Sequence, residues 1–326
     1  MAPLASAQES TGAAARLSRG LFKNGEVTLR AFEPISRATR DSVVKLDLNG
    51  ATIALGTVID RNGLAVTKAS EIRQGKLTCW LANGKEVDAQ VVRVDEKNDL
   101  ALVKVDAKGL KPIQWAMGEV SVGQWVVTPG IAATPQAIGI VSVRRRRILP
   151  KRALIGVQLD TKTHSTQIAQ VMQGLGAEKA GLKPGDRILA VNDSPVNEGE
   201  ELLKALRQFR EGQSVKLRVQ REKEEFDASV KLGALRPEAA ARGLEREDRM
   251  NHMGSEISQR GEDFEFAIQH DTVLQAWQCG GPLVNLDGKA VGLNIARAGR
   301  VASYALPADL LQRAIQKLRT APEPLP

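Results

Sequence analysis

The residues that could do chemistry gather late in the chain, at positions 275–294, which read QAWQCGGPLVNLDGKAVGLN. There Cys279 stands directly before Gly280-Gly281-Pro282, and two apolar runs follow, divided by Asp287-Gly288. This pattern predicts a loop that displays a thiol and then leads into a hairpin. Because the thiolate is the reactive form of cysteine, Cys279 would act as a nucleophile only beside a base or a positive charge.

Three histidines could supply such a base: His164, His252 and His270. Only His270, which is followed by Asp271, lies near Cys279 in the sequence, so a Cys279–His270 dyad oriented by Asp271 is one hypothesis. A histidine that hydrogen-bonds within a barrel is the alternative. The His, Cys and Asp residues lack the spacing of a metal site, and no glycine pair has the context of a nucleotide fingerprint. We therefore expect no cofactor.

Composition argues for a soluble-type globular chain of several domains. The 326 residues carry a net charge of +8, with 42% hydrophobic, 26% charged and only 3% aromatic residues. Few aromatics leave little for base stacking, so we expect no nucleic-acid partner. The dense basic cluster at 144–147 is interpreted as a solvated hinge, with a site for an acidic partner and a nucleic-acid contact as the alternatives.

Targeting signals are sparse. No apolar run approaches the roughly 18 residues that a membrane-spanning helix needs. Residues Ala5-Ser6-Ala7 have the small-x-small form of a signal-peptidase site, although few residues precede them. We expect residues 1–26 to be disordered or the remnant of a signal peptide, and the protein to be periplasmic or secreted.

The elements that must position Cys279 are mostly strands. A short amphipathic helix is predicted for residues 27–40. From residue 42 onward, short apolar runs alternate with Asn-Gly turns, and the turns fall at positions 49–50, 62–63 and 83–84. Strands at this spacing without intervening helices favour an antiparallel barrel or sandwich.

A different pattern begins near residue 149. The stretch AEKAGLKPGDRILAVNDSPV resembles the PDZ domain attached to bacterial HtrA proteases. The resemblance implies that an extended peptide adds as a strand and that backbone N–H groups hold its terminal carboxylate. The peptide-binding residues would then be Leu154, Ile155, Gly156 and Val157. Lys151 and Arg152 would supply countercharge, and the helix ELLKALRQF would form the second wall.

The flanking segments are similar, in order, to the trypsin-like domain of HtrA/DegP serine proteases. The quoted motifs are GTVIDRNGLAVTKAS, NDLALVKVDA, VGQWVV and CGGPLVNLDGKAVGLNIA. The implied fold is mostly β: a two-barrel, chymotrypsin-fold domain with an inserted α+β PDZ-like domain. The predicted segments are 27–148 for the first barrel and the start of the second, 149–235 for the PDZ-like domain, 236–263 for a connector, and 264–326 for the remainder of the second barrel and a C-terminal helix.

This resemblance assigns three positions to a His-Asp-Ser triad. Asp99 falls on the aspartate, Ser70 falls where the histidine should be, and Cys279 falls on the nucleophilic serine. Trp277 replaces the glycine two residues before the nucleophile, which disfavours the backbone geometry of an oxyanion hole. Because a hydroxyl has no useful pKa near 7, Ser70 cannot act as the base. Asp99 is expected to accept a bond from Ser70 or to cap a turn.

The combined interpretation is a degenerate, pseudoprotease-like member of the family. Its function would be to bind or scaffold peptides and protein C-terminal segments. One alternative is an active endopeptidase that uses Cys279, because the Gln-Cys-Gly-Gly loop also resembles that of viral chymotrypsin-fold cysteine proteases. A purely structural protein is the other alternative. Relatives of HtrA are commonly trimeric, which makes a homo-oligomer an open expectation.

Overall fold

The computed structural model describes residues 19–149, 153–160, 165–206, 209, 212–234 and 256–320. The chain divides into two compact units, one of residues 1–145, 257–260 and 268–326, the other of residues 146–256 and 261–267. Most of the predicted disordered N-terminus and of the predicted connector lies outside the described residues. No helix in the described part of the chain is long and apolar enough to cross a membrane.

The N-terminal segment forms two short helices where the sequence predicted one. The helical elements before the first strand are η1 (Arg19–Leu21), α1 (Glu26–Ala31), α2 (Glu33–Thr39) and η2 (Arg40–Ser42). Phe32 ends α1 and also precedes α2, whose first turn contains Pro34. Proline fits the first turn of a helix, where its missing N–H is not needed, but disfavours a helical residue before it. The prediction of one continuous helix was therefore wrong.

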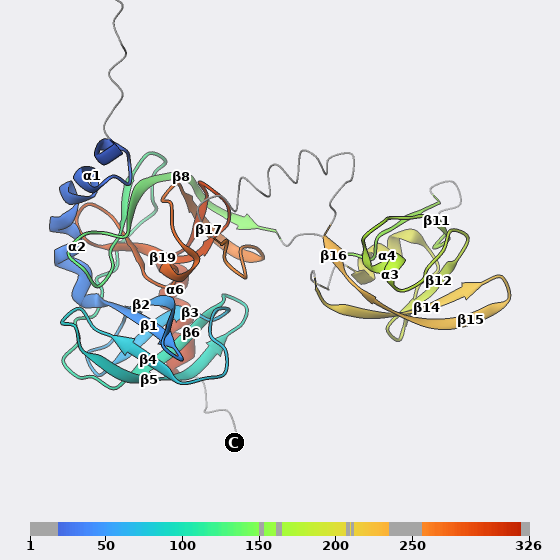
Figure 1. The fold of residues 1–326 in the computed structure, drawn as a ribbon, viewed down its shortest axis with the longest axis horizontal. Helices are drawn as coiled ribbons and strands as arrows, with labels where there is room; N and C mark the ends of the chain where they lie inside the picture. The colour runs from blue at the N-terminus through green and yellow to red at the C-terminus, as the bar shows by residue number, and fades with distance from the viewer. Residues whose placement is uncertain are drawn as a thin grey trace, which may run out of the picture. The chain divides into compact units, whose positions relative to one another are not determined.

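The first barrel is closed and entirely antiparallel. Its strands follow the order β1-β2-β3-β6-β5-β4 (Figure 1). They are β1 (Val43–Leu48), β2 (Ala51–Val58), β3 (Leu64–Lys68), β4 (Leu77–Trp80), β5 (Glu86–Asp95) and β6 (Leu100–Val105). At the β1–β2 turn, Asn49 and Gly50 both take positive φ, at 52° and 85°, as an Asn-Gly hairpin turn requires.

The second barrel combines strands from both sides of the middle of the chain. Its order is β17-β20-β19-β18-β7-β8, so green β8 and orange β17 belong to one barrel in Figure 1. The strands are β7 (Trp125–Thr128), β8 (Ala137–Ile148), β17 (Phe264–His270), β18 (Pro282–Val284), β19 (Ala290–Arg297) and β20 (Ser303–Pro307). Helix η3 (Ala276–Gln278) precedes β18, and α6 (Ala308–Thr320) follows β20.

The arginine cluster at 144–147 lies in strand β8, where the chain passes from the first unit to the second after Arg145. Its apolar neighbours continue the strand to Ile148, which is buried. Arg145 Nη1 lies 2.8 Å from the Oδ2 atom of Asp309 in α6. The cluster is thus a largely exposed strand face, and Arg145 pairs with a residue of α6. The hinge interpretation stays a prediction.

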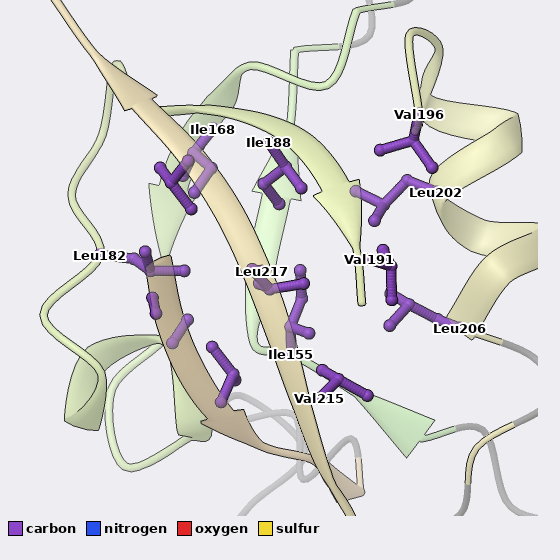
Figure 2. Packing of buried hydrophobic residues seen from close by; sticks show 14 of the residues in the cluster. Ile155, Ile168, Leu182, Ile188, Val191, Val196, Leu202, Leu206, Val215 and Leu217 are labelled. Atoms are coloured by element: carbon purple, nitrogen blue, oxygen red, sulfur yellow. The ribbon is translucent and has the colours of Figure 1, made fainter. Parts of the chain in front are cut away.

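The middle unit has its own sheets, helices and core. Its elements are β9 (Ala153–Leu154), β10 (Val157–Leu159), β11 (Ile168–Val171), α3 (Gly176–Lys179), β12 (Arg187–Val191), β13 (Ser194–Pro195), α4 (Gly199–Leu206), β14 (Ser214–Arg221), β15 (Glu224–Lys231) and β16 (Gly233–Ala234). Figure 2 shows Ile168, Ile188 and Leu217 packed together, and all three are fully buried. Such a continuous apolar cluster is typical of an independently packed domain.

The two ends of the middle unit lie side by side. Strand β9, near its start, pairs antiparallel with β16, near its end, with Leu154 opposite Gly233 and Ala153 opposite Ala234. A segment whose ends meet can be inserted into another fold without opening it. The strand pairing thus gives a physical reason why β8 and β17, on either side of this unit, can share one barrel.

Candidate active site and peptide groove

Ser70 and Asp99 are brought together by adjacent strands of the first barrel. Ser70 follows the end of β3, and Asp99 precedes β6, which pairs with β3. Asp99 takes a positive φ of 57°, and its backbone oxygen accepts a bond from the N–H of Ala69 at 2.9 Å. Its Oδ1 accepts the backbone N–H of Ser70 at 2.7 Å, and its Oδ2 accepts the Ser70 hydroxyl at 3.0 Å. The expected Ser70–Asp99 bond is confirmed.

The Asp99 carboxylate is buried, with an exposed fraction of 3%. Burial raises the pKa of Asp99 because it penalises the charged form. The positive charge of Lys68, whose Nζ lies 3.9 Å from Oδ2, and the two bonds from Ser70 partly offset this rise. The pair is therefore a partly buried structural contact, and among the described residues no hydrogen bond links it to the Cys279 thiol.

Lys68 is a buried cation that the sequence interpretation missed. Its side chain has no exposed surface, although it ends the mostly apolar strand β3. Its Nζ lies 3.3 Å from Glu71 Oε1 and donates to the backbone oxygen of Arg260 at 3.1 Å. A lysine inside an apolar strand, with a glutamate three residues later, was the available signal, because a buried charge requires such partners.

Cys279 lies in the loop between η3 and β18, on the second barrel. Its side chain has no exposed surface and packs with Ala137 and Leu274. Burial raises the pKa of the Cys279 thiol, and the charge of nearby Lys68 opposes this rise without cancelling it. A buried thiol with a raised pKa is a poor nucleophile, because little thiolate forms near pH 7.

The backbone around Cys279 is folded so that its donors are already used. The N–H of Cys279 donates to the Ala276 oxygen at 3.2 Å, and the N–H of Gln278 donates to the Gln275 oxygen at 3.0 Å. Trp277 is the central residue of this 3₁₀ turn, η3. An oxyanion hole needs N–H groups that point at the substrate, and the N–H at the nucleophile position here points into its own loop.

The loop is pressed against the first barrel. Gly280 takes a φ of +91°, and a Cβ there would lie 2.1 Å from the Leu55 oxygen and 2.4 Å from Thr67 Oγ1. The oxygen of Cys279 accepts the N–H of Leu55 at 2.9 Å. Cys279 therefore lies at the seam between the barrels. Within the described residues, however, Ser70 shares no hydrogen bond with Cys279.

One further segment, just before β17, reaches this seam and was not predicted. Ser258 Oγ lies 3.7 Å from Cys279 Sγ. The N–H of Ser258 donates to the Arg297 oxygen at 3.0 Å, and Arg297 N–H donates back to Ser258 Oγ at 2.9 Å. Arg297 ends β19 with only 1% of its surface exposed. These hydrogen bonds join positions 39 residues apart, so local sequence patterns could not predict them.

His270 does not serve as a base for Cys279 in this arrangement. It is fully buried, and its Nδ1 lies 2.5 Å from Thr272 Oγ1. Burial lowers the pKa of His270 to about 3. Asp271 is engaged elsewhere, because its Oδ1 accepts the N–H of Ile140 at 2.7 Å and its Oδ2 pairs with Lys23 at 2.7 Å. The geometry thus favours a histidine bonded within its barrel, and His164 and His252 lie outside the described residues.

The predicted peptide-binding residues line an apolar groove in the middle unit. The groove encloses a cavity of about 60 Å³. It is lined by Leu154, Ile155, Gly156, Val157, Leu159, Met172, Leu202, Leu203 and Leu206. Gly156 takes a φ of +90°, and a Cβ there would lie 2.4 Å from Leu175 Cβ, so only glycine fits. The expected countercharges, Lys151 and Arg152, lie outside the described residues.

Metal-binding chemistry has no centre in the described part of the chain, where no three His, Cys, Asp or Glu side chains group closely enough to hold an ion.

Comparison with known proteins agrees with the fold. Residues 54–174 match the Trypsin-like peptidase domain family, and residues 153–232 match the PDZ domain family. "Serine protease HTRA1" of Xenopus tropicalis is 22% identical over 259 residues, covering 79% of this chain and 34% of that protein. "Probable periplasmic serine endoprotease DegP-like" of Hahella chejuensis is 23% identical over 266 residues, covering 55% of this chain and 56% of that protein.

A solved structure, "HtrA-type protease AlgWS227A with decapeptide", is 15% identical, with a TM-score of 0.30, covering 64% of this chain and 98% of that one. The chain spans about a third to about a half of the length of the two relatives described above. The two domain matches and these relatives identify the chain as a member of the HtrA type of trypsin-like, PDZ-containing proteins. The predicted family and the predicted mostly β fold class are confirmed.

Proposed function

We propose that this HtrA-type protein binds the C-terminal segments of peptides or proteins in its PDZ groove and does not hydrolyse them. The observation that carries the proposal is the closed state of the site around Cys279. Its thiol is fully buried, and its N–H is bonded to Ala276. Peptide hydrolysis at this position would need an exposed nucleophile, a base and a free oxyanion donor.

The residues at the other two triad positions support the same function. Ser70 cannot accept a proton near pH 7, and it already donates its hydroxyl to Asp99. An aspartate in a triad orients an imidazole, and Asp99 has only a serine to hold. Ser70, Asp99 and Cys279 are thus the remains of a triad, a pseudoprotease site that keeps the two-barrel scaffold in place.

The groove supplies the binding function. Its apolar lining suits one aliphatic side chain at a peptide terminus, and the glycine at 156 lets the peptide carboxylate approach the backbone of residues 154–157. The free side of β10, which contains Gln158 and Leu159, would pair with the peptide as an added strand. Affinity in the range of about one to tens of micromolar is expected, because the interface is small and the peptide must be ordered.

A periplasmic or secreted location belongs to the same proposal. One relative is named as a periplasmic endoprotease, and peptide tails of exported proteins would meet the groove there. Cell fractionation of a tagged full-length protein tests this part, and recovery with cytoplasmic markers alone would contradict it.

The binding test uses the full chain and a library of fluorescent peptides with varied C-termini, read by anisotropy. Free-acid peptides should bind several-fold more tightly than amidated ones, and mass spectrometry should find the bound peptides intact. Gly156→Val should weaken binding, because its side chain would meet Leu175. Gly185→Val is the matched control, since Gly185 has a similar φ of +93° but open space around it. Equal binding of free-acid and amidated peptides would contradict carboxylate recognition.

A further inference from the structure

The segment Ile257–Arg260, here called the strap, forms hydrogen bonds with residues of both barrels. On the second barrel two bonds join it to Arg297: Ser258 N–H donates to the Arg297 oxygen at 3.0 Å, and Arg297 N–H donates to Ser258 Oγ at 2.9 Å. Arg297 ends strand β19. One of these bonds joins the two backbones and the other uses the Ser258 hydroxyl, so the strap is fixed to the end of β19 at Ser258.

On the first barrel the strap is held by charged and backbone groups. Glu71 Oε1 accepts the N–H of Gln259 at 3.2 Å, and the Lys68 ammonium donates to the oxygen of Arg260 at 3.1 Å. The Arg260 guanidinium donates to the backbone oxygens of Glu96 and, at 2.9 Å, of Lys97. Bonds of this charge-assisted kind are the stronger ones in proteins.

Between these two anchors the strap covers the thiol. Ser258 is 6% exposed, and its Oγ lies 3.7 Å from Cys279 Sγ. The buried state of Cys279 thus depends in part on a segment that belongs to neither barrel sheet. The buried ammonium of Lys68 has the same dependence, because one of its bonds goes to the oxygen of Arg260.

We infer that the strap is the resident occupant of the seam, a peptide bound in cis that closes the Cys279 site and must leave before any other peptide or reagent can reach the thiol. The class of ligand that the seam accepts is then an extended segment with a small hydroxyl residue two positions before an arginine. This inference does not depend on what the PDZ groove binds, or on whether Cys279 is catalytic.

The strap should open as a local unit while the barrels stay folded. Segments with few buried apolar contacts open at lower free energy than a core, and a reagent then labels in proportion to the open population. Cys79 provides an internal reference, because it is fully buried in β4 within the first barrel and burial raises its pKa to about 12. Labelling of Cys279 without Cys79 therefore reports strap opening and not global unfolding.

The test measures iodoacetamide labelling of both cysteines in the full chain by peptide-resolved mass spectrometry. Arg260→Ala removes the guanidinium bonds and should speed labelling of Cys279 about tenfold, with Cys79 unchanged. Gln259→Ala is the control within the strap, because only the backbone N–H of Gln259 holds Glu71. Unchanged Cys279 labelling in Arg260→Ala would overturn the inference.

A second variant decides the case in which Arg260→Ala unfolds the protein and both cysteines react. Ser258→Cys places a thiol where the hydroxyl now meets Cys279, so mild oxidation by copper-phenanthroline should link residues 258 and 279. Gln259→Cys, whose exposed side chain is one position further along, should not form that link. Failure of the Ser258→Cys variant to cross-link would overturn the inference by itself.

Discussion

Asp99 accepts two hydrogen bonds from Ser70, one from its backbone N–H at 2.7 Å and one from its hydroxyl at 3.0 Å. Both carboxylate oxygens therefore bind Ser70, and Oδ2 also lies 3.9 Å from Lys68 Nζ. In a triad one of these oxygens would accept a bond from an imidazole at position 70, and here Oδ2 accepts the serine hydroxyl instead. Asp99 thus links the end of β3 to the start of β6. The effect of this link on stability can be tested without assuming any activity.

Asp99 should give the protein a pH dependence of defined sign. Burial raises the pKa of Asp99 above its ordinary value of 3.8, so the native state keeps a proton that the unfolded chain has released. Stability from this group is present on the acid side and is lost as pH rises from near 3.8 through the raised pKa. The free energy of unfolding of wild type minus that of Asp99→Asn should fall across that window, as measured by urea denaturation.

Asp271→Asn provides the control of opposite sign in the same unit. Burial alone would raise the pKa of Asp271, but Lys23 and the N–H of Ile140 bring it below 3.8. Its contribution is present above the unfolded pKa and is lost as pH falls. If the free energy of unfolding of wild type minus that of Asp99→Asn increased with rising pH, the raised pKa of Asp99 would be contradicted.

His270 should remain neutral down to unusually low pH. Its pKa of about 3, set by burial, lies below the ordinary 6.5, so the unfolded chain binds the proton first and stability is lost as pH falls through this interval. In a two-dimensional NMR titration of the imidazole signals, His270 should show no change between pH 8 and 5. A midpoint near 6.5, together with slower labelling of Cys279 in His270→Ala, would revive the dyad hypothesis.

The strands and turns could be read from the sequence because their causes are local. The alternation of buried and exposed residues in β14 and the positive φ at Asn49 and Gly50 come from a few adjacent residues. The break at Pro34 was also local and was missed, because an apolar periodicity ran through it. The strap could not be predicted, since its partners, Lys68 and Arg297, lie 192 and 39 residues away from the strap residues that they bind.

In the candidate site, too, some features could be predicted from the sequence and others depend on the three-dimensional packing. The family resemblance assigned Ser70 and Asp99 to two triad positions. The pairing of β3 with β6 in the barrel then brings the two residues into contact. The burial of Cys279 and the bond from its N–H to Ala276 depend on how the loop closes in three dimensions. Residue types alone therefore allowed the hypothesis that Cys279 is a nucleophile, and the packing around its thiol argues against that hypothesis.

Rebuilding the triad should demand a change in η3 as well. Ser70→His with Cys279→Ser restores the side chains around Asp99, but the turn centred on Trp277 still binds the N–H of residue 279 to Ala276. Adding Trp277→Gly should raise casein cleavage about a hundredfold over the double variant, the usual value of an oxyanion donor. Ala276→Gly in place of Trp277→Gly is the matched control, and equal rates with and without Trp277→Gly would show that the oxyanion argument is mistaken.

The most direct measurement is whether the purified full chain cuts unfolded protein. Fluorescein-labelled, unfolded casein should release no more fluorescence with wild type than with Cys279→Ala or with buffer, while trypsin in parallel confirms that the substrate is cleavable. This result is predicted because the thiol is buried, its N–H is occupied and Ser70 cannot act as a base. Release by wild type that disappears in Cys279→Ala would contradict the account.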